Sequence, residues 1–258
     1  MILFRRTESF KEYLYAYPVI SSIAAINLLL WVITGLFSNP LGNSIYQWGA
    51  GVNLFISYGE YWRLISPVFL HAPGSISHVL FNCFSLVIFG PALEQMLGKL
   101  RFILIYLLTG IIGNAVTYVL DPYSFVSHIG ASGAIYGLFG IYLFMVYFRK
   151  HLIDAANAQL VVIIFVIGIV MSLFSANINL TAHLAGAVGG FVLAPLFLLK
   201  AQPFSIYRNK RPKEHEGDAG FDPNRWKKRP YGKRTNKKLI LWIIIAALVL
   251  IGIYDYMT

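Results

Sequence analysis

Seven long apolar segments that contain no Asp, Glu, Lys or Arg constrain this chain of 258 residues more than any other feature. They cover residues 19–37, 76–93, 102–120, 131–148, 158–174, 181–199 and 239–254. A helix needs about 20 apolar residues to cross roughly 30 Å of hydrocarbon. A helix also satisfies its own backbone hydrogen bonds in lipid. The sequence therefore predicts an all-α protein, a polytopic membrane helix bundle.

The composition excludes the main soluble classes. Hydrophobic residues make up 57% of the chain and charged residues 12%, whereas soluble domains carry about 25% charged residues. Cys83 is the only cysteine, so a disulfide scaffold within the chain is impossible.

The chain has a net charge of +10, and its Lys and Arg residues lie almost entirely on one side of the predicted membrane topology. If the amino terminus is cytoplasmic, all 21 Lys and Arg residues except Arg63 fall in segments on the inner face. This asymmetry follows the positive-inside rule and predicts an outer carboxyl terminus after seven spans. The basic loop 201–238 is expected to lie beside anionic lipid. Contact with RNA or a ribosome is the alternative for this loop, but no nucleic-acid partner is expected.

Four polar side chains of the spans fall at the same depth, near the outer face: His78, Asn82, Ser132 and His183. Ionisable residues inside a membrane are costly and are functional candidates by default. The alternative is structural, since a buried His or Asn can simply bridge two helices. Serines of membrane helices also commonly bond to their own backbone, as is expected here of Ser21, Ser22, Ser85 and Ser172.

These four residues suit nucleophilic catalysis. A serine hydroxyl needs a base to remove its proton, and neutral histidine is the usual base. Ser132 follows Gly130 and Ala131 at the start of a helix, where unpaired backbone N–H groups could stabilise an oxyanion. His78 and Asn82 are four residues apart, so they share a helix face and could add two further donors.

Small residues at four-residue spacing favour close packing of the two helices that would carry Ser132 and His183. One pair is Gly133 and Gly137, and the other is Gly186 and Gly190. Such pairs let helix backbones approach closely, as a hydrogen bond between a serine and a histidine across two helices requires. In membrane helices they are also common as simple packing devices. No acidic residue obviously orients His183.

Three motifs of the sequence resemble those of the rhomboid intramembrane serine proteases, both in their order along the chain and in the helices on which they are expected. The motifs are Gly130-Ala131-Ser132-Gly133, Ala182-His183-x-x-Gly186-x-x-x-Gly190 and His78-x-x-x-Asn82. Tyr61-Trp62-Arg63 with Phe69-Leu70-His71 resembles the first outer loop of that family, and Glu94-x-x-x-Gly98 the end of its second helix. The resemblance covers roughly residues 10–200.

The resemblance implies a Ser132–His183 dyad that hydrolyses peptide bonds of membrane proteins. It further implies an oxyanion hole at the Ser132 amide, His78 and Asn82, with Gly130 as a further residue that stabilises the transition state. Tyr136 would pack against the catalytic histidine, and Gly186 would support it. Substrates in the bilayer of a bacterial plasma membrane are the expected partners, and neither a cofactor nor a metal is expected.

The expected organisation has four parts. Residues 1–18 form a cytoplasmic or interfacial segment and residues 19–200 a six-helix rhomboid-like core. Residues 201–238 form the basic cytoplasmic loop and residues 239–258 carry a seventh transmembrane helix, as in family members of the six-plus-one type.

The main functional alternative is a rhomboid-like pseudoprotease, which would bind and escort transmembrane proteins without cleaving them. A transporter or channel fits less well, because no span carries an acidic residue.

Overall fold

A computed structural model describes residues 3–4, 8–36, 40–175, 178–205 and 208, and the fold below is that of these residues. The chain divides into two compact units, Met1–Asn209 and Lys210–Thr258. The predicted seventh helix, and all of the basic loop except 201–205 and 208, lie outside the described residues.

Six long apolar helices occupy the first six predicted spans. They are α2 (Pro18–Trp31, continued by a π-helical turn over Val32–Leu36), α5 (Ile76–Leu97), α6 (Lys99–Leu120), α7 (Ser132–Phe148), α8 (Ala155–Leu173) and α9 (Leu180–Phe197). Five are long and apolar enough to cross a membrane, while α7 is shorter, with 17 residues. The predicted fold class, a polytopic helical membrane bundle, is confirmed.

Shorter elements surround these helices. They are α1 (Phe10–Ala16), α3 (Pro40–Gly49), β1 (Gly51–Val52), α4 (Asn53–Ser57), β2 (Ser127–His128) and 3-10 turns at Tyr61–Leu64, Ser66–Phe69 and Leu198–Lys200. Ser9 and Glu12 close a capping box at the start of α1. The strands β1 and β2 pair antiparallel, with Gly51 opposite His128. This pair joins the loop that follows α2 to the loop that precedes α7.

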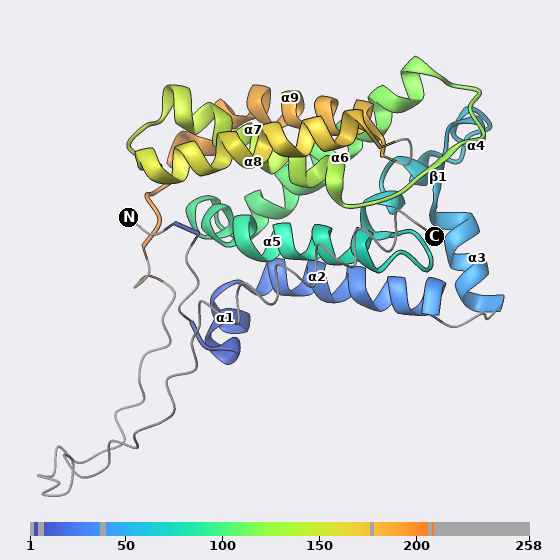
Figure 1. The fold of residues 1–258 in the computed structure, drawn as a ribbon, viewed down its shortest axis with the longest axis horizontal. Helices are drawn as coiled ribbons and strands as arrows, with labels where there is room; N and C mark the ends of the chain where they lie inside the picture. Colours follow the sequence, from blue (N-terminus) through green and yellow to red (C-terminus); the bar gives the residue numbers. More distant parts are fainter. Residues whose placement is uncertain (1–2, 5–7, 37–39, 176–177, 206–207, 209–258) are drawn as a thin grey trace, which may run out of the picture. The chain divides into compact units, whose positions relative to one another are not determined.

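The long helices run side by side (Figure 1). Helix α2 packs on α5, whereas α6, α7 and α9 pack on one another and α8 covers α7 and α9. The core between them is apolar, and its largest fully buried side chains include Leu86, Phe102, Ile105, Leu138 and Tyr142. Because consecutive helices reverse direction, the first residues of α5, α7 and α9 lie at the same end of the bundle, together with the end of α8.

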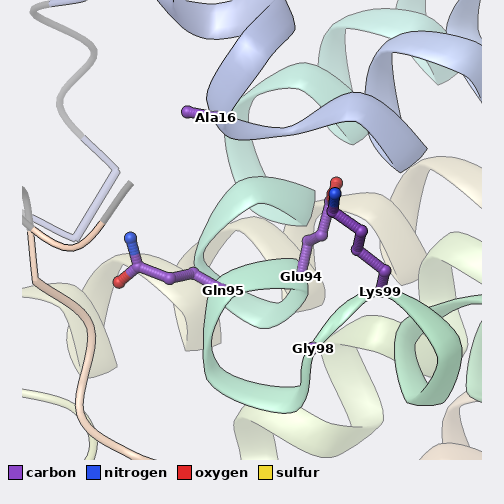
Figure 2. A pocket seen from close by; sticks show the side chains of 5 residues that line it. All are labelled: Ala16, Glu94, Gln95, Gly98 and Lys99. Atoms are coloured by element: carbon purple, nitrogen blue, oxygen red, sulfur yellow. The ribbon is translucent and has the colours of Figure 1, made fainter. Parts of the chain in front are cut away.

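A carboxylate joins α5 to the start of α2 at the opposite end of the bundle. Glu94 accepts hydrogen bonds from the backbone N–H groups of Val19 at 3.1 Å and Ile20 at 2.9 Å. One turn later Gly98, with φ of +82°, ends α5 in a conformation that favours glycine. Glu94 and Gly98 line a small cavity together with Ala16, Gln95 and Lys99 (Figure 2).

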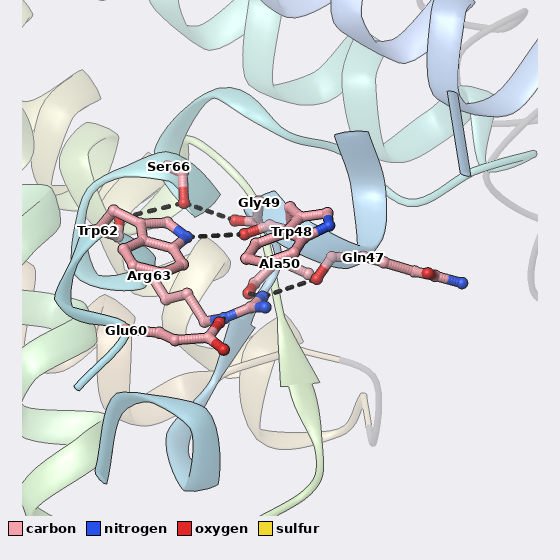
Figure 3. Close-up of polar contacts among 8 residues, drawn as sticks. All are labelled: Gln47, Trp48, Gly49, Ala50, Glu60, Trp62, Arg63 and Ser66. Atoms are coloured by element: carbon pink, nitrogen blue, oxygen red, sulfur yellow. Dashed lines mark hydrogen bonds and ion pairs between the residues drawn. The ribbon is translucent and has the colours of Figure 1, made fainter. Parts of the chain in front are cut away.

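The loop between α2 and α5 is folded around a buried arginine (Figure 3). Arg63 is 3% exposed, and its guanidinium donates to the carbonyls of Gln47 at 2.7 Å and Ala50 at 2.6 Å. It also forms an ion pair with Glu60 at 2.6 Å. These donors belong to one planar guanidinium group, whose geometry a lysine could not reproduce. The loop is thereby held against the end of the bundle that carries the residues described next.

Candidate active site

Ser132 is the first residue of α7 and is half-buried. The first four N–H groups of a helix have no acceptor within the helix, and the Ser132 amide is the first of them. The chain enters α7 through Gly130, whose φ of +122° lies in the region that favours glycine. The Gly130 amide donates to the Pro67 carbonyl at 2.9 Å, which holds this entry against the outer loop.

His78 of α5 faces Ser132 across Gly130. A Cβ atom at Gly130 would lie 2.7 Å from His78 Nε2 and 3.6 Å from Ser132 Oγ, so both polar atoms border the same small space. The Ala72 amide donates to His78 Nδ1 at 3.3 Å. A neutral imidazole that accepts at one nitrogen carries its proton on the other. His78 therefore presents an Nε2–H donor toward this space.

Asn82 lies one turn further along α5 and is buried. Its amide nitrogen donates to the His78 carbonyl at 2.8 Å. An amide group has two N–H donors, so one of them is left over after this bond. The shared helix face predicted for His78 and Asn82 is thus observed.

His183 lies in the first turn of α9 and is 5% exposed. Tyr136 of α7 stacks on its ring, with 4.1 Å between ring centroids and 18° between planes. Its Nδ1 atom lies 2.8 Å from the hydroxyl oxygen of Ser172, near the end of α8. Ser172 also donates to the Gly168 carbonyl at 2.7 Å, as expected of a serine within a membrane helix. Its contact with His183 was not predicted.

The glycine pairs bring α7 and α9 into backbone contact. A Cβ atom at Gly186 would overlap the Gly133 carbonyl, and one at Gly190 would overlap the Gly137 carbonyl. The close approach predicted from the four-residue spacing is confirmed. Gly133 also faces Ala182, the residue before His183, since a Cβ at Gly133 would lie 3.5 Å from the Ala182 carbonyl oxygen.

Among the described residues, no hydrogen bond joins Ser132 to His183 directly. Catalytic hydrogen bonds are often long in proteins without substrate and tighten when substrate binds. The structure thus places Ser132, His78, Asn82, His183, Tyr136 and Gly186 at one end of the bundle.

Gly130 lies beside the expected oxyanion hole, and its backbone N–H group has a partner in the outer loop. Its N–H group is already bonded to the Pro67 carbonyl, so it has no donor to offer to a substrate. Its contribution is the space and the backbone conformation that leave Ser132 and His78 facing each other.

Two loop histidines near this end of the bundle are buried and neutral. Burial lowers the pKa of His71 to about 3, with His78 as a smaller cause. Burial alone lowers the pKa of His128 to about 4, and this ring packs against Gly51 of the paired strand. His128 was not singled out from the sequence, because no motif surrounds it. Among the described residues, no group of three or more His, Cys, Asp or Glu could hold a metal ion.

Comparison with known proteins identifies the family. The rhomboid domain model matches residues 58–200. The rhomboid protein YdcA of Bacillus subtilis is 46% identical over 203 residues, which are 78% of this chain and 98% of YdcA. This chain belongs to the rhomboid family.

Other relatives are rhomboid proteins of longer chain length. The rhomboid protease GluP of Bacillus subtilis is 36% identical over 162 residues, 62% of this chain and 31% of GluP. RHOMBOID-like protein 1 of Arabidopsis thaliana is 29% identical over 215 residues, 83% of this chain and 52% of the relative. The matched rhomboid domain contains all of the predicted site residues, from His78 to Gly186. This rhomboid is an integral membrane protein.

Proposed function

We propose that this rhomboid protein is an intramembrane serine protease, which hydrolyses peptide bonds in or near transmembrane segments of other membrane proteins. Relatives named as rhomboid proteases support the protease class. The observation that carries the proposal is the space at Gly130, which Ser132 Oγ and His78 Nε2 both border at the start of a helix. In this proposal Ser132 is the nucleophile and His183 the general base.

The first half of the reaction forms an acyl-enzyme. His183 Nε2 takes the hydroxyl proton of Ser132 while Oγ attacks the carbonyl carbon of the scissile bond. A tetrahedral intermediate with a negatively charged oxygen results. The imidazolium of His183 then gives its proton to the leaving amine nitrogen, the C–N bond breaks and the acyl group stays on Ser132.

The second half restores the enzyme. His183 takes a proton from a water molecule, whose oxygen attacks the acyl carbon. The second tetrahedral intermediate collapses, Ser132 regains its proton from His183 and the carboxylic acid product leaves.

Three donors would stabilise the negative oxygen in both intermediates. They are the Ser132 amide at the start of α7, the Nε2–H of His78 and the remaining amide N–H of Asn82. Preorganised donors in a site with little water commonly supply the largest single part of the catalytic effect. The positive end of the α7 dipole adds to this stabilisation.

Topology and partners are part of the same proposal. The amino terminus is cytoplasmic, the site opens near the outer face of a bacterial plasma membrane, and the carboxyl terminus after a seventh helix is outside. Residues 1–18, 19–200, 201–238 and 239–258 are the corresponding segments. Substrates are membrane proteins in the same bilayer.

The test is cleavage of a transmembrane substrate in liposomes that contain the full-length protein. We expect cleavage by the wild-type protein and its loss in both Ser132→Ala and His183→Ala variants, with the double variant little worse than either. Thermal stability close to wild type serves as the folding control. Binding of the substrate without cleavage would favour the pseudoprotease alternative, and cleavage by Ser132→Ala would contradict the proposal.

A further inference from the structure

A serine on α8 lies behind the proposed catalytic base. We propose that Ser172 is a positioning residue for His183, which keeps the imidazole proton on Nδ1 and leaves Nε2 free to accept the proton of Ser132. This inference rests on the proposed Ser132–His183 dyad and deepens it. It assigns the orienting role for which no acidic residue is obvious in the sequence.

The hydrogen-bond geometry carries the proposal. The Ser172 oxygen lies 2.8 Å from His183 Nδ1 and 2.7 Å from the Gly168 carbonyl oxygen. Ser172 is 4% exposed and His183 is 5% exposed. A hydroxyl has a single proton, and a carbonyl oxygen can only accept. When the hydroxyl proton goes to Gly168, a lone pair of Ser172 faces Nδ1, which must then be the donor.

The same geometry suits both protonation states of His183 during catalysis. In the resting state Nδ1–H donates to Ser172, so Nε2 has a free lone pair. After His183 takes the proton of Ser132, both ring nitrogens carry protons and Nδ1–H keeps its acceptor without rearrangement. The opposite tautomer would place a proton on Nε2 and block the base. In a serine protease triad, the wrong histidine tautomer lowers kcat about 10⁴-fold.

Helix α8 also contacts Tyr136, the aromatic side chain that packs on the ring of His183. Gly168 lies one turn before Ser172, and a Cβ atom there would overlap the Tyr136 hydroxyl. Tyr136 in turn stacks on His183. The ring of His183 is therefore supported on one face from α7 and on its Nδ1 edge from α8. Among the described residues, Tyr136 stacks on this ring and also forms a side-chain hydrogen bond with Ser172, and His78 acts on the ring electrostatically.

The kinetic test uses the full-length protein in detergent micelles and the rate of its reaction with a fluorophosphonate. We expect Ser172→Ala to react about 10- to 100-fold more slowly, because Nδ1–H loses its acceptor in a buried place. Ser172→Thr keeps the hydroxyl and should recover most of the rate. Ser21→Ala is the matched control, since the Ser21 hydroxyl donates only to the Tyr17 carbonyl of its own helix, and it should react at the wild-type rate.

A spectroscopic readout separates positioning from simple structural support. In protein labelled with ¹⁵N-histidine, the ring signals of His183, assigned by comparison with His183→Gln, should show the Nδ1–H tautomer. Ser172→Ala should lose this preference, and Ser172→Thr should keep it. If Ser172→Ala is too unstable to purify, the tautomer of His183 in the wild-type protein tests the proposed role of Ser172 by itself.

An Nε2–H tautomer in the wild-type protein would overturn the assignment of Ser172, as would a wild-type reaction rate for Ser172→Ala. Failure of the proposed function looks different. In that case the wild-type protein would not react with the fluorophosphonate at all, while the tautomer of His183 would still report whether Ser172 orients the ring.

Discussion

Replacing Gly186 with alanine should separate α7 from α9 at the proposed dyad. The added Cβ atom would overlap the backbone carbonyl of Gly133, directly after Ser132 in the chain. A backbone carbonyl within a helix cannot rotate away as a side chain can. The helices must therefore move apart by roughly 1 Å, because nonbonded heavy atoms need about 3.5 Å between their centres.

This movement should lower both the stability of the protein and the rate of the reaction at Ser132. Overpacking of a well-packed contact costs about 1–3 kcal/mol of stability, and the better helix propensity of alanine returns about 1 kcal/mol of it. Misplacement of catalytic groups by about 1 Å costs around 10²-fold in rate. Gly186→Ala should thus lose more activity than stability.

Gly189→Ala provides a matched control on the same helix. A Cβ atom at Gly189 would meet Ile112, 2.9 Å from its Cδ1 atom and 3.1 Å from its Cγ2 atom. The nearer atom, Cδ1, is the far end of a side chain and can turn away, whereas a backbone carbonyl cannot, so this variant should lose less stability and less activity than Gly186→Ala. Thermal unfolding in micelles and the rate of fluorophosphonate labelling measure the two effects. If Gly186→Ala labels at the wild-type rate, or Gly189→Ala is damaged as strongly, the close contact between α7 and α9 does not position the dyad.

Three further variants test the folded outer loop, the buried His128 and the role of Asn82. Arg63→Ala should lower the free energy of unfolding by about 3 kcal/mol, because Glu60 and two carbonyls lose a buried partner. Arg63→Lys should recover little of this stability. A wild-type unfolding temperature for both variants would show that Arg63 does not hold the loop. The pKa of His128 is lowered to about 4 in the folded protein and is about 6.5 when unfolded, so unfolded chains bind more protons between these values. Stability should then fall as the pH drops from 6.5 to 4, less steeply in His128→Gln, and equal slopes in thermal-unfolding series would refute this. Asn82→Ala should lower the turnover of substrate by roughly 10²-fold, and a less stable protein with unchanged turnover would mean that Asn82 is structural.

The long helices are predictable because length and apolarity alone determine them in lipid. The starts of α6 at Lys99 and α8 at Ala155 precede the predicted apolar segments, since polar residues can form a first helical turn without being apolar. The elements between α2 and α5 are not predictable in the same way. They are short, and contacts such as that of Arg63 with the carbonyls of Gln47 and Ala50 hold them.

The placement of the candidate site at one end of the bundle was predictable where residue type and depth coincide, as for Ser132, His78, Asn82 and His183. Two contacts of the candidate site, that of Ser172 with His183 and that of Gly130 with Pro67, depend on tertiary structure and were not predicted. The sequence indicates correctly that Ser172 bonds to its own helix, but its contact with His183 requires that α8 and α9 lie side by side. The sequence around Gly130 likewise gives no sign that its amide is bonded to Pro67, far earlier in the chain.

The site of covalent modification by a fluorophosphonate tests directly whether Ser132 is a nucleophile activated by His183. An activated serine attacks the phosphorus atom, forms an O–P bond and expels fluoride, while the base takes the hydroxyl proton. Mass spectrometry of the digested wild-type protein should find the adduct on Ser132 alone. The adduct should be absent from Ser132→Ala and strongly reduced in His183→Ala. An adduct on another residue, or undiminished labelling of Ser132 without His183, would contradict the account.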